Sequence, residues 1–416
     1  MTDLSVSVII VSRDRPQALL HCLTGVRQLI YPNFEVVVIA DSSGIDALNR
    51  SEFRGKIKTR LFEQPNISAA RNEGLSQAAG EIVAFIDDDA VPEPGWLIHL
   101  IAPFEDETID AAGGYVRGRN GISYQWKASG TDSLGYETDL KLVGDSIAVL
   151  KGSSDRAIKT QGTNCAFRKQ TLMEMGGFDT AFHFFLDETD VNMRLAVAGC
   201  KTAIVPRAEV HHGYLGSQRR SNNRMPVSLF DVGASTVVFL RKHAAKQRHE
   251  KRLSNLVSEQ KKALLEHMVK GNCEPGEIDM VLLTLHAGIK EGTHRQIENP
   301  QKIDPSSAPF LPFCSSNPAP EHKIIEGFRL DSEKLHQKAR RSADSGNITS
   351  LYVFSRTALF HRTFFHKDGY WVQTGGLLGK SERSEKLMSW NTMDEKVKKE
   401  MTRVAQARFP ANRLVN

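Results

Sequence analysis

Phe85-Ile86-Asp87-Asp88-Asp89-Ala90-Val91 is the stretch that decides the fold, because an apolar strand from Ile82 to Ile86 ends there in three consecutive carboxylates. Three like charges repel one another and cannot all be buried without a cation. Ligands of open α/β sheets bind at the carboxyl ends of the strands. The stretch therefore predicts a site for a divalent metal that carries a nucleotide diphosphate. The alternative is an acidic turn in which Asp caps the chain locally.

Residues 5–105 alternate strand and helix patterns around this stretch. Apolar strands are predicted at 5–11 and 35–40, and helices begin near Pro16, Asn66 and Pro94. This rhythm predicts an α/β fold, with a mostly parallel central sheet, helices on both faces and right-handed crossovers. No G-x-G-x-x-G follows the first strand and no phosphate-binding P-loop occurs, which disfavours dinucleotide and P-loop sites.

Composition sets the broad class. The chain has 416 residues, 40% of them hydrophobic and 25% charged, as in an ordinary globular protein of two or three domains. No apolar window is long enough for a membrane-spanning helix, and the apolar stretch Val6–Val11 is too short for a signal peptide. Five scattered cysteines without a CxxC pair favour reduced thiols over disulfides or a zinc site. We expect a cytoplasmic protein, with peripheral contact at the inner face of the membrane as an option.

The net charge of +5 is unevenly placed. Between residues 219 and 252, nine cationic side chains face only Asp231 and Glu250. Such a cluster suits an anionic membrane or a phosphate-bearing acceptor, and the alternative is a solvated helix face. No nucleic-acid motif is present, so nucleic acid is not an expected partner. The cationic residues are Arg219, Arg220, Arg224, Arg241, Lys242, Lys246, Arg248, Lys251 and Arg252.

A second acidic segment, Phe184–Leu195, opens an amphipathic helix. Asp187, Glu188 and Asp190 stand at its start, where acids favour the helix dipole and Asp190 suits a cap. The functional alternative is that one carboxylate removes a proton from an attacking hydroxyl. A later strand ends in His211-His212, and a His beside an acidic site is a candidate metal ligand.

Six motifs occur in order over residues 5–215, and together they are far more specific than each alone. They are Val8–Pro16, Val38–Ser43, Ala69–Gly74, Phe85–Asp89, Gly162–Arg168, and Gly176–Asp179 with Asp187–Arg194. In this order they resemble a family 2 glycosyltransferase with the GT-A fold. The resemblance implies inverting transfer of a sugar from a nucleotide-diphosphate donor to a hydroxyl of a glycan or lipid-linked acceptor. It also implies Mn²⁺ or Mg²⁺ as cofactor and a place in polysaccharide or glycoconjugate synthesis.

The resemblance also assigns residue roles. Asp41 would contact the base of the nucleotide sugar and Asp87 its ribose. Arg71 and Asp88 would lie near the nucleotide sugar. Asp89 and His212 would bind the metal or the diphosphate, and Asn164 and Asp190 would border the acceptor. The family's usual Glu-Asp pair is Asp187-Glu188 here. Glu188 is therefore the expected general base, with Asp187 as the alternative.

Four segments are predicted. Residues 1–215 form the GT-A domain, 216–291 a helical extension, 292–322 a Pro-rich connector, and 323–416 a region of unknown role. The C-terminal half is expected to be mainly helical, with a β-hairpin near residues 366–376. Tyr370 and Trp371 of that hairpin either contact a sugar or a protein, or anchor the tail on the first domain.

Other classes remain open at this point. The Asp87–Val91 pattern also fits haloacid-dehalogenase phosphatases, but two strong strands precede it and no suitable lysine segment follows. A nucleotidyltransferase would need a glycine-rich basic loop after the first strand, which the chain lacks. A transferase-like scaffold without activity is the non-enzymatic alternative.

Overall fold

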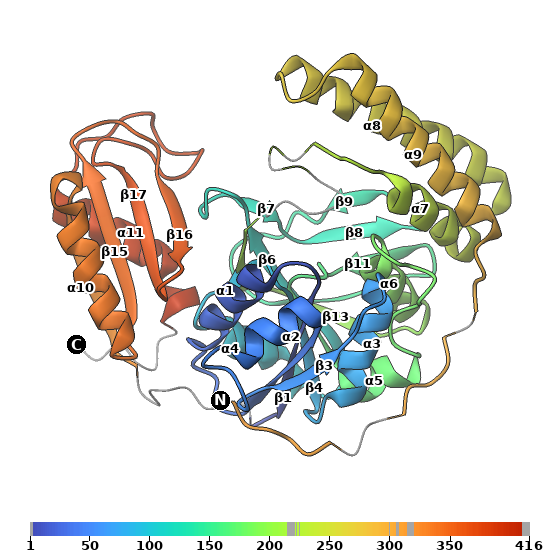
Figure 1. Cartoon of the computed structure of the whole chain (residues 1–416), viewed down its shortest axis with the longest axis horizontal. Coiled ribbons are helices and arrows are strands. Elements are labelled where there is room, and N and C mark those ends of the chain that lie inside the picture. Colours follow the sequence, from blue (N-terminus) through green and yellow to red (C-terminus); the bar gives the residue numbers. More distant parts are fainter. Residues whose placement is uncertain are drawn as a thin grey trace.

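The computed structural model describes residues 3–213, 221, 223, 225–298, 300–304, 308–313 and 320–409. The chain forms a large sheet domain (residues 3–213), a helical region beside it and a C-terminal module (residues 320–409) on the opposite side (Figure 1). Among the described residues, no helix is long and apolar enough to cross a membrane.

A ten-stranded sheet forms the centre of the sheet domain. Its main path runs β10-β13-β6-β12-β4-β1-β2-β3, with β5 beside β13 and β7 beside β6. β1, β2, β3 and β4 are parallel, as are β6 and β13, and β12 lies antiparallel between β4 and β6. The mostly parallel sheet that was predicted is confirmed. The bounds are β1 (Val6–Ser12), β2 (Phe34–Ala40), β3 (Lys58–Leu61), β4 (Ile82–Asp87), β5 (Ala90–Pro92), β6 (Ile109–Arg117), β7 (Tyr124–Trp126), β10 (Ala148–Lys151), β12 (Cys165–Arg168) and β13 (Lys201–His212).

Helices cover both faces of this sheet because successive strand residues point to opposite sides. Val8 and Ile10 of β1 pack in one buried cluster, together with the helices α1, α2 and α4. Ile9, between them, packs in the other, with α3, α5 and α6. The bounds are α1 (Pro16–Val26), α2 (Ser42–Asn49), α3 (Ile67–Gln77), α4 (Trp96–Ile101) with the short η1 (Ala102–Glu105), α5 (Lys169–Glu174) and α6 (Asp187–Val197).

A small antiparallel sheet and three helices adjoin the sheet domain. The small sheet has the order β11-β8-β9. α7 packs against α9, and α9 packs against α8. α9 begins at Pro275 with a capping box between Glu274 and Glu277. The bounds are β8 (Ser129–Asp132), β9 (Glu137–Asp139), β11 (Arg156–Lys159), α7 (Phe230–His243), η2 (Lys246–Arg248), α8 (His249–Val269) and α9 (Pro275–His294).

The described parts of the Pro-rich connector lie on the sheet domain. The Ile303 amide donates to the Met173 carbonyl at 3.1 Å, and the Phe313 amide donates to the Phe34 carbonyl at 2.8 Å. The Phe313 ring is buried and packs against the rings of Phe34 and Phe53. Residues 300–304 and 308–313 lie in no helix or strand, and these contacts anchor them.

The C-terminal module is an α/β unit. Its sheet has the order β14-β15-β17-β16, in which β14, β15 and β17 are parallel and β16 pairs antiparallel with β17. The predicted hairpin is therefore present as β16–β17, but it belongs to a larger sheet that the sequence did not indicate. The bounds are β14 (His322–Phe328), η3 (Arg329–Asp331), α10 (Ser332–Asp344), β15 (Ile348–Ser355), β16 (Arg362–His366), β17 (Tyr370–Gly376) and α11 (Met393–Arg408).

Candidate functional site

The two predicted metal ligands, Asp89 and His212, meet where β4 and β13 end, and they are joined there by Asp87, which was predicted to contact the ribose. One ligand atom from each of Asp87, Asp89 and His212 lies within 4.8 Å of the other two. The His212 Nε2 atom is 3.4 Å from Asp89 Oδ1, and its Nδ1 atom is 3.2 Å from Gln125 Oε1. Two carboxylates and an imidazole fit Mn²⁺ or Mg²⁺. The sequence did not single out Gln125, which orients the His212 ring.

Asp88 lies in the turn after β4, and its carboxylate contacts Arg15 and Ser12. Its carboxylate is fully buried, 2.6 Å from Arg15 Nη2, and accepts a hydrogen bond from Ser12 Oγ at 2.7 Å. Burial raises the pKa of Asp88 to about 7, although the Arg15 charge opposes this shift. A contact of Asp88 with the donor, as predicted, would require this ion pair to open. Arg15 also lies 3.3 Å from Asp89, a role the sequence did not reveal.

Arg71 joins the metal-binding edge to α6. Its buried guanidinium forms an ion pair with Asp187 and lies 3.3 Å from Asp87 Oδ1. Burial acts to lower the pKa of Arg71, but the charges of Asp187 and Asp87 outweigh it and raise that pKa. The cation therefore holds both carboxylates in place. Because Asp187 is buried in this pair, the geometry favours Glu188 over Asp187 as a base that must reach an acceptor.

Glu188 occupies the first turn of α6, with its side chain 17% exposed. The helix follows two non-glycine residues in left-handed conformation, Phe185 at φ 73° and Leu186 at φ 64°. Such backbone is costly and persists where surrounding structure enforces it. Lys159 Nζ on β11 lies 3.8 Å from Glu188 Oε1 and is also paired with Glu137. Neither the turn nor Lys159 was indicated by the sequence.

The two predicted acceptor residues have internal contacts. Asp190 is fully buried and paired with Lys242 and His243 of α7, at 2.7 Å and 2.8 Å, and with Arg194 on its own helix. Burial acts to raise the pKa of Asp190, but the His243 hydrogen bond and the cations lower it. Asp190 thus fixes α6 against α7. The acceptor role stays a prediction.

Asn164 is likewise fully buried. Its side chain accepts a hydrogen bond from Trp96 Nε1 at 2.8 Å and donates to the carbonyls of Tyr115 and Ala208 at 2.9 Å and 2.8 Å. These bonds tie three strands and α4 together beneath the site. The predicted contact with an acceptor is not tested by this arrangement.

Asp41 ends β2 on the same edge of the sheet as Asp87, since β1 pairs with both strands in register. Its carboxylate caps α2 by accepting the Gly44 amide at 3.0 Å, and it accepts the Asp14 amide at 3.1 Å. Burial acts to raise the pKa of Asp41, but these two backbone donors lower it. Recognition of a nucleobase by Asp41 remains a prediction.

His211 faces the C-terminal module instead of the metal ligands. Its Nε2 atom is 2.8 Å from Glu93 Oε1, and its ring centroid is 4.7 Å from that of Trp371. Tyr370 and Trp371 are both buried and present no face to a sugar. Trp371 packs against the sheet domain, whereas Tyr370 lies in the module's own core. The metal-binding strand β13 is thus supported from behind by the C-terminal module.

The basic segment is only partly described. Arg219, Arg220 and Arg224 lie outside the described residues. Arg241 donates to the carbonyls of Gly292 and Arg295, and Arg252 lies over the Tyr136 ring. Some of these charges therefore serve packing within the chain.

The order of strands around β4, with a candidate metal-binding cluster at its end, agrees with the predicted GT-A fold. Residues 7–168 match the family model described as "Glycosyl transferase family 2".

Two curated relatives are similar to part of the chain. A "Pre-mycofactocin glycosyltransferase" of Mycobacterium tuberculosis is 26% identical over 216 residues, which cover 50% of this chain and 43% of the relative. A "Glucosyl-dolichyl phosphate glucuronosyltransferase" of Haloferax volcanii is 26% identical over 180 residues, covering 42% of this chain and 56% of the relative. The match thus spans about half the length of these relatives.

Two solved structures are similar over part of the chain. The mannosyltransferase PcManGT from Pyrobaculum calidifontis, in complex with GDP-Man and Mn²⁺, has a TM-score of 0.41 at 17% identity and covers 71% of this chain and 74% of its own. GalNAc-T7 with UDP, GalNAc and Mn²⁺ has a TM-score of 0.42 at 18% identity, covering 57% and 48%.

Proposed function

We propose that this protein transfers a sugar from a nucleotide-diphosphate donor to an acceptor hydroxyl, with a divalent metal and with inversion. The observation that carries the proposal is the linked geometry of the two halves of the site. Asp87 belongs to the group of candidate metal ligands, and Arg71 joins Asp87 to the segment that bears Glu188. The family of residues 7–168 supports glycosyl transfer as the reaction.

Each residue has a defined task in this proposal. Asp87, Asp89 and His212 would hold the metal, which when bound would supply positive charge to offset the negative charge of the departing diphosphate. Glu188 accepts the proton of the acceptor hydroxyl as its oxygen bonds to the anomeric carbon. The bond from that carbon to the diphosphate breaks in the same step. Attack from the face opposite the leaving group inverts the configuration.

The proposal extends to the acceptor class. We assign a hexose-type donor and a glycan or lipid-linked acceptor, in polysaccharide or glycoconjugate synthesis. The name of the Haloferax relative describes a lipid-linked substrate, which supports the lipid-linked option. The contact of Glu188 with Lys159 supports the assignment of Glu188 as the base. The Lys159 ammonium, 3.8 Å from Glu188 Oε1, helps to hold the carboxylate in one orientation.

The test is the release of nucleoside diphosphate from a panel of UDP-, GDP- and dTDP-sugars with simple p-nitrophenyl glycosides as acceptors. Glu188→Gln should lower kcat by a factor of about 10² to 10⁴ without weakening donor binding, as expected for loss of a general base. Glu107→Gln, an exposed Glu remote from α6, is the matched control and should retain full activity.

Full turnover by Glu188→Gln would refute the assignment of the base. Donor binding without turnover in the wild-type protein, with every acceptor, would instead favour the inactive scaffold. Transfer of a nucleotidyl group or hydrolysis of a phosphomonoester would favour the two other enzyme classes considered above.

A further inference from the structure

One end of the C-terminal module carries a group of exposed large apolar side chains, which we call the apical rim. Trp390 is 89% exposed, Leu330 is 99% exposed and Phe360 is 63% exposed. The rim lies at one end because β14, β15 and β17 are parallel and each is followed by one of its segments. In Figure 1 the loops after β15 and β17 form the upper tip of the module. The rim consists of Leu330, Leu359, Phe360, Leu387, Met388 and Trp390.

The two longer rim segments are joined by backbone contacts. The Leu378 amide donates to the Thr357 carbonyl at 3.1 Å, and the His361 amide donates to the Lys380 carbonyl at 3.2 Å. Gly379 forms a bridge with Met388. The segments that carry residues 359–360 and 387–390 therefore lie next to each other at this end of the module.

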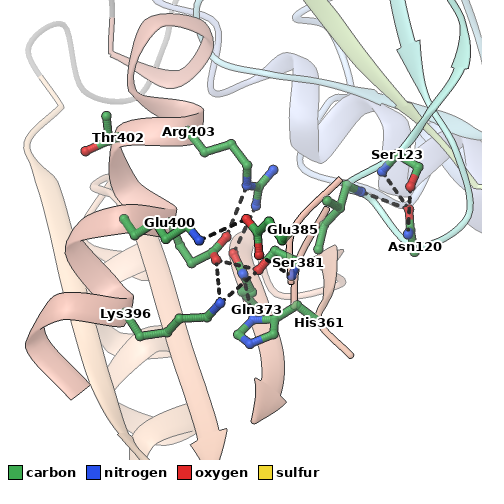
Figure 2. A network of polar contacts seen from close by, with 12 residues as sticks. Asn120, Ser123, His361, Gln373, Ser381, Glu385, Lys396, Glu400, Thr402 and Arg403 are labelled. Atoms are coloured by element: carbon green, nitrogen blue, oxygen red, sulfur yellow. Dashed lines mark hydrogen bonds and ion pairs between the residues drawn. The ribbon is translucent and has the colours of Figure 1, made fainter. Parts of the chain in front are cut away.

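A buried polar network fixes the base of the rim (Figure 2). Lys396 Nζ on α11 donates to the Gly379 carbonyl at 2.9 Å and lies 3.2 Å from Glu400 Oε1. Glu400 also accepts a hydrogen bond from Ser381, which lies in the loop after β17, and pairs with Arg403 at 3.1 Å. The rim is thus mounted on an ordered support, which favours a defined contact surface over a loose loop.

Cationic side chains accompany the apolar ones. Five cationic residues lie on the rim segments against three acidic residues, and the acidic Glu385 is already paired with Lys399 at 3.1 Å. Lys380 Nζ lies 5.4 Å from the centroid of the Phe360 ring, so charge and aromatic surface are interleaved. The cationic residues are Arg329, Arg356, Lys380, Arg383 and Lys386, and the acidic ones are Asp331, Glu382 and Glu385.

The rim and the metal-binding edge face the same side. At the start of β17, Gly369 accepts a hydrogen bond from Gln28, which follows α1 at the amino edge of the large sheet. Thr363 of β16 is paired with Gln373 of β17. Its amide donates a hydrogen bond at 2.8 Å to the carbonyl of Asn120, which lies in the loop after β6. β17 therefore runs in the same sense as the large sheet's parallel strands. Both carboxyl edges, and the sites on them, open in one direction.

We propose that the apical rim docks the protein on an anionic lipid bilayer, with the metal-binding edge open toward the membrane. Trp and Phe suit the interfacial zone of a bilayer, and Lys and Arg beside them suit anionic headgroups. Charge complementarity selects an anionic bilayer over a neutral one. This inference does not rest on the transferase activity.

The test is co-sedimentation of the full chain with vesicles of phosphatidylcholine alone and with added phosphatidylglycerol. The wild-type protein should bind the anionic vesicles and not the neutral ones. Phe360→Ser with Trp390→Ser should lower the partition coefficient at least about tenfold, because two aromatic side chains lose their apolar burial. Val197→Ser, which changes a 65% exposed apolar residue at the carboxyl end of α6, is the matched control and should bind as the wild type does.

Quenching of tryptophan fluorescence provides a second readout. Lipids brominated near the headgroup should quench tryptophan fluorescence of the wild-type protein and not of Trp390→Phe. Absence of wild-type binding to anionic vesicles, or full binding by the double variant, would overturn the proposal. So would lipid-free, concentration-dependent self-association that the double variant abolishes, because the rim would then bind a second copy. Equal thermal unfolding midpoints should confirm that the exposed substitutions leave the fold intact.

Discussion

Arg408 and Glu93 form a two-pronged buried ion pair between the C-terminal module and the sheet domain. Arg408 Nε is 2.8 Å from Glu93 Oε2, and Nη2 is 2.7 Å from Oε1. The guanidinium carbon also lies 4.3 Å from the centroid of the Trp371 ring. Glu93 follows β5 directly and pairs with His211, the neighbour of the metal ligand His212. The pair therefore couples docking of the module to the shape of the metal-binding edge.

Arg408→Met should destabilise the protein by about 3–5 kcal/mol, because it leaves the Glu93 carboxylate buried without its counter-charge. Urea unfolding monitored by tryptophan fluorescence measures this loss. Arg341→Met, at an exposed position on α10, is the matched control and should change stability by less than about 0.5 kcal/mol. Equal stability of the two variants would mean that the interface does not depend on the Arg408–Glu93 pair.

Gln125→Leu should weaken Mn²⁺ binding about tenfold or more, because His212 loses the partner that orients its ring 3.2 Å away. Calorimetric titration of the protein with Mn²⁺ in the presence of a nucleoside diphosphate measures the affinity. Gln64→Leu, at an exposed position, should bind Mn²⁺ as the wild type does. Unchanged affinity in Gln125→Leu would remove Gln125 from the metal site.

The lowered pKa of Glu400 predicts how the free energy of unfolding depends on pH. Burial acts to raise the pKa of Glu400, but Arg403 and the hydrogen-bond donors around it outweigh burial and lower that pKa from 4.5 to about 2. Because this pKa is lower in the folded protein, the ionised carboxylate stabilises the fold at pH values above the pKa that Glu400 has in the unfolded chain. This stabilisation is lost as the pH falls from about 4.5 toward about 2.

The stability difference between the wild-type protein and Glu400→Gln should therefore be largest near neutral pH and shrink below about pH 4.5. Urea unfolding at a series of pH values measures both curves. Parallel curves for the two proteins across this range would contradict the ion-pair network of Lys396, Glu400 and Arg403.

Sequence patterns predicted the large sheet because its strands are apolar runs separated by turn signals, and period and polarity are local properties. The motif resemblance predicted that Asp87, Asp89 and His212 would serve one site, and the structure brings them within 4.8 Å. Their meeting depends on the parallel pairing of β13 with β6, which no local pattern near His212 reveals.

Other features depend on tertiary contacts that leave no local pattern. The sequence around Arg15 indicates only a polar turn. Its ion pair with Asp88 forms because β1 and β4 are neighbours in the sheet. Lys159 lies on an edge strand of the small sheet and contacts Glu188, which is 29 residues further along the chain. A separation of this length matches no secondary-structure period, so the contact could not be predicted. β14 alternates weakly and is half exposed, so its parallel pairing with β15 could not be predicted from periodicity.

The most direct test of the proposed donor site is a thermal-shift panel of UDP, GDP, dTDP and CDP, each with Mn²⁺ and with EDTA. At about 100 times its dissociation constant, a ligand should stabilise the fold by roughly 2.7 kcal/mol. We predict a shift with one nucleoside diphosphate that requires Mn²⁺ and is lost in Asp89→Asn. Absence of any metal-dependent shift, or an undiminished shift in Asp89→Asn, would contradict the metal-bound donor site.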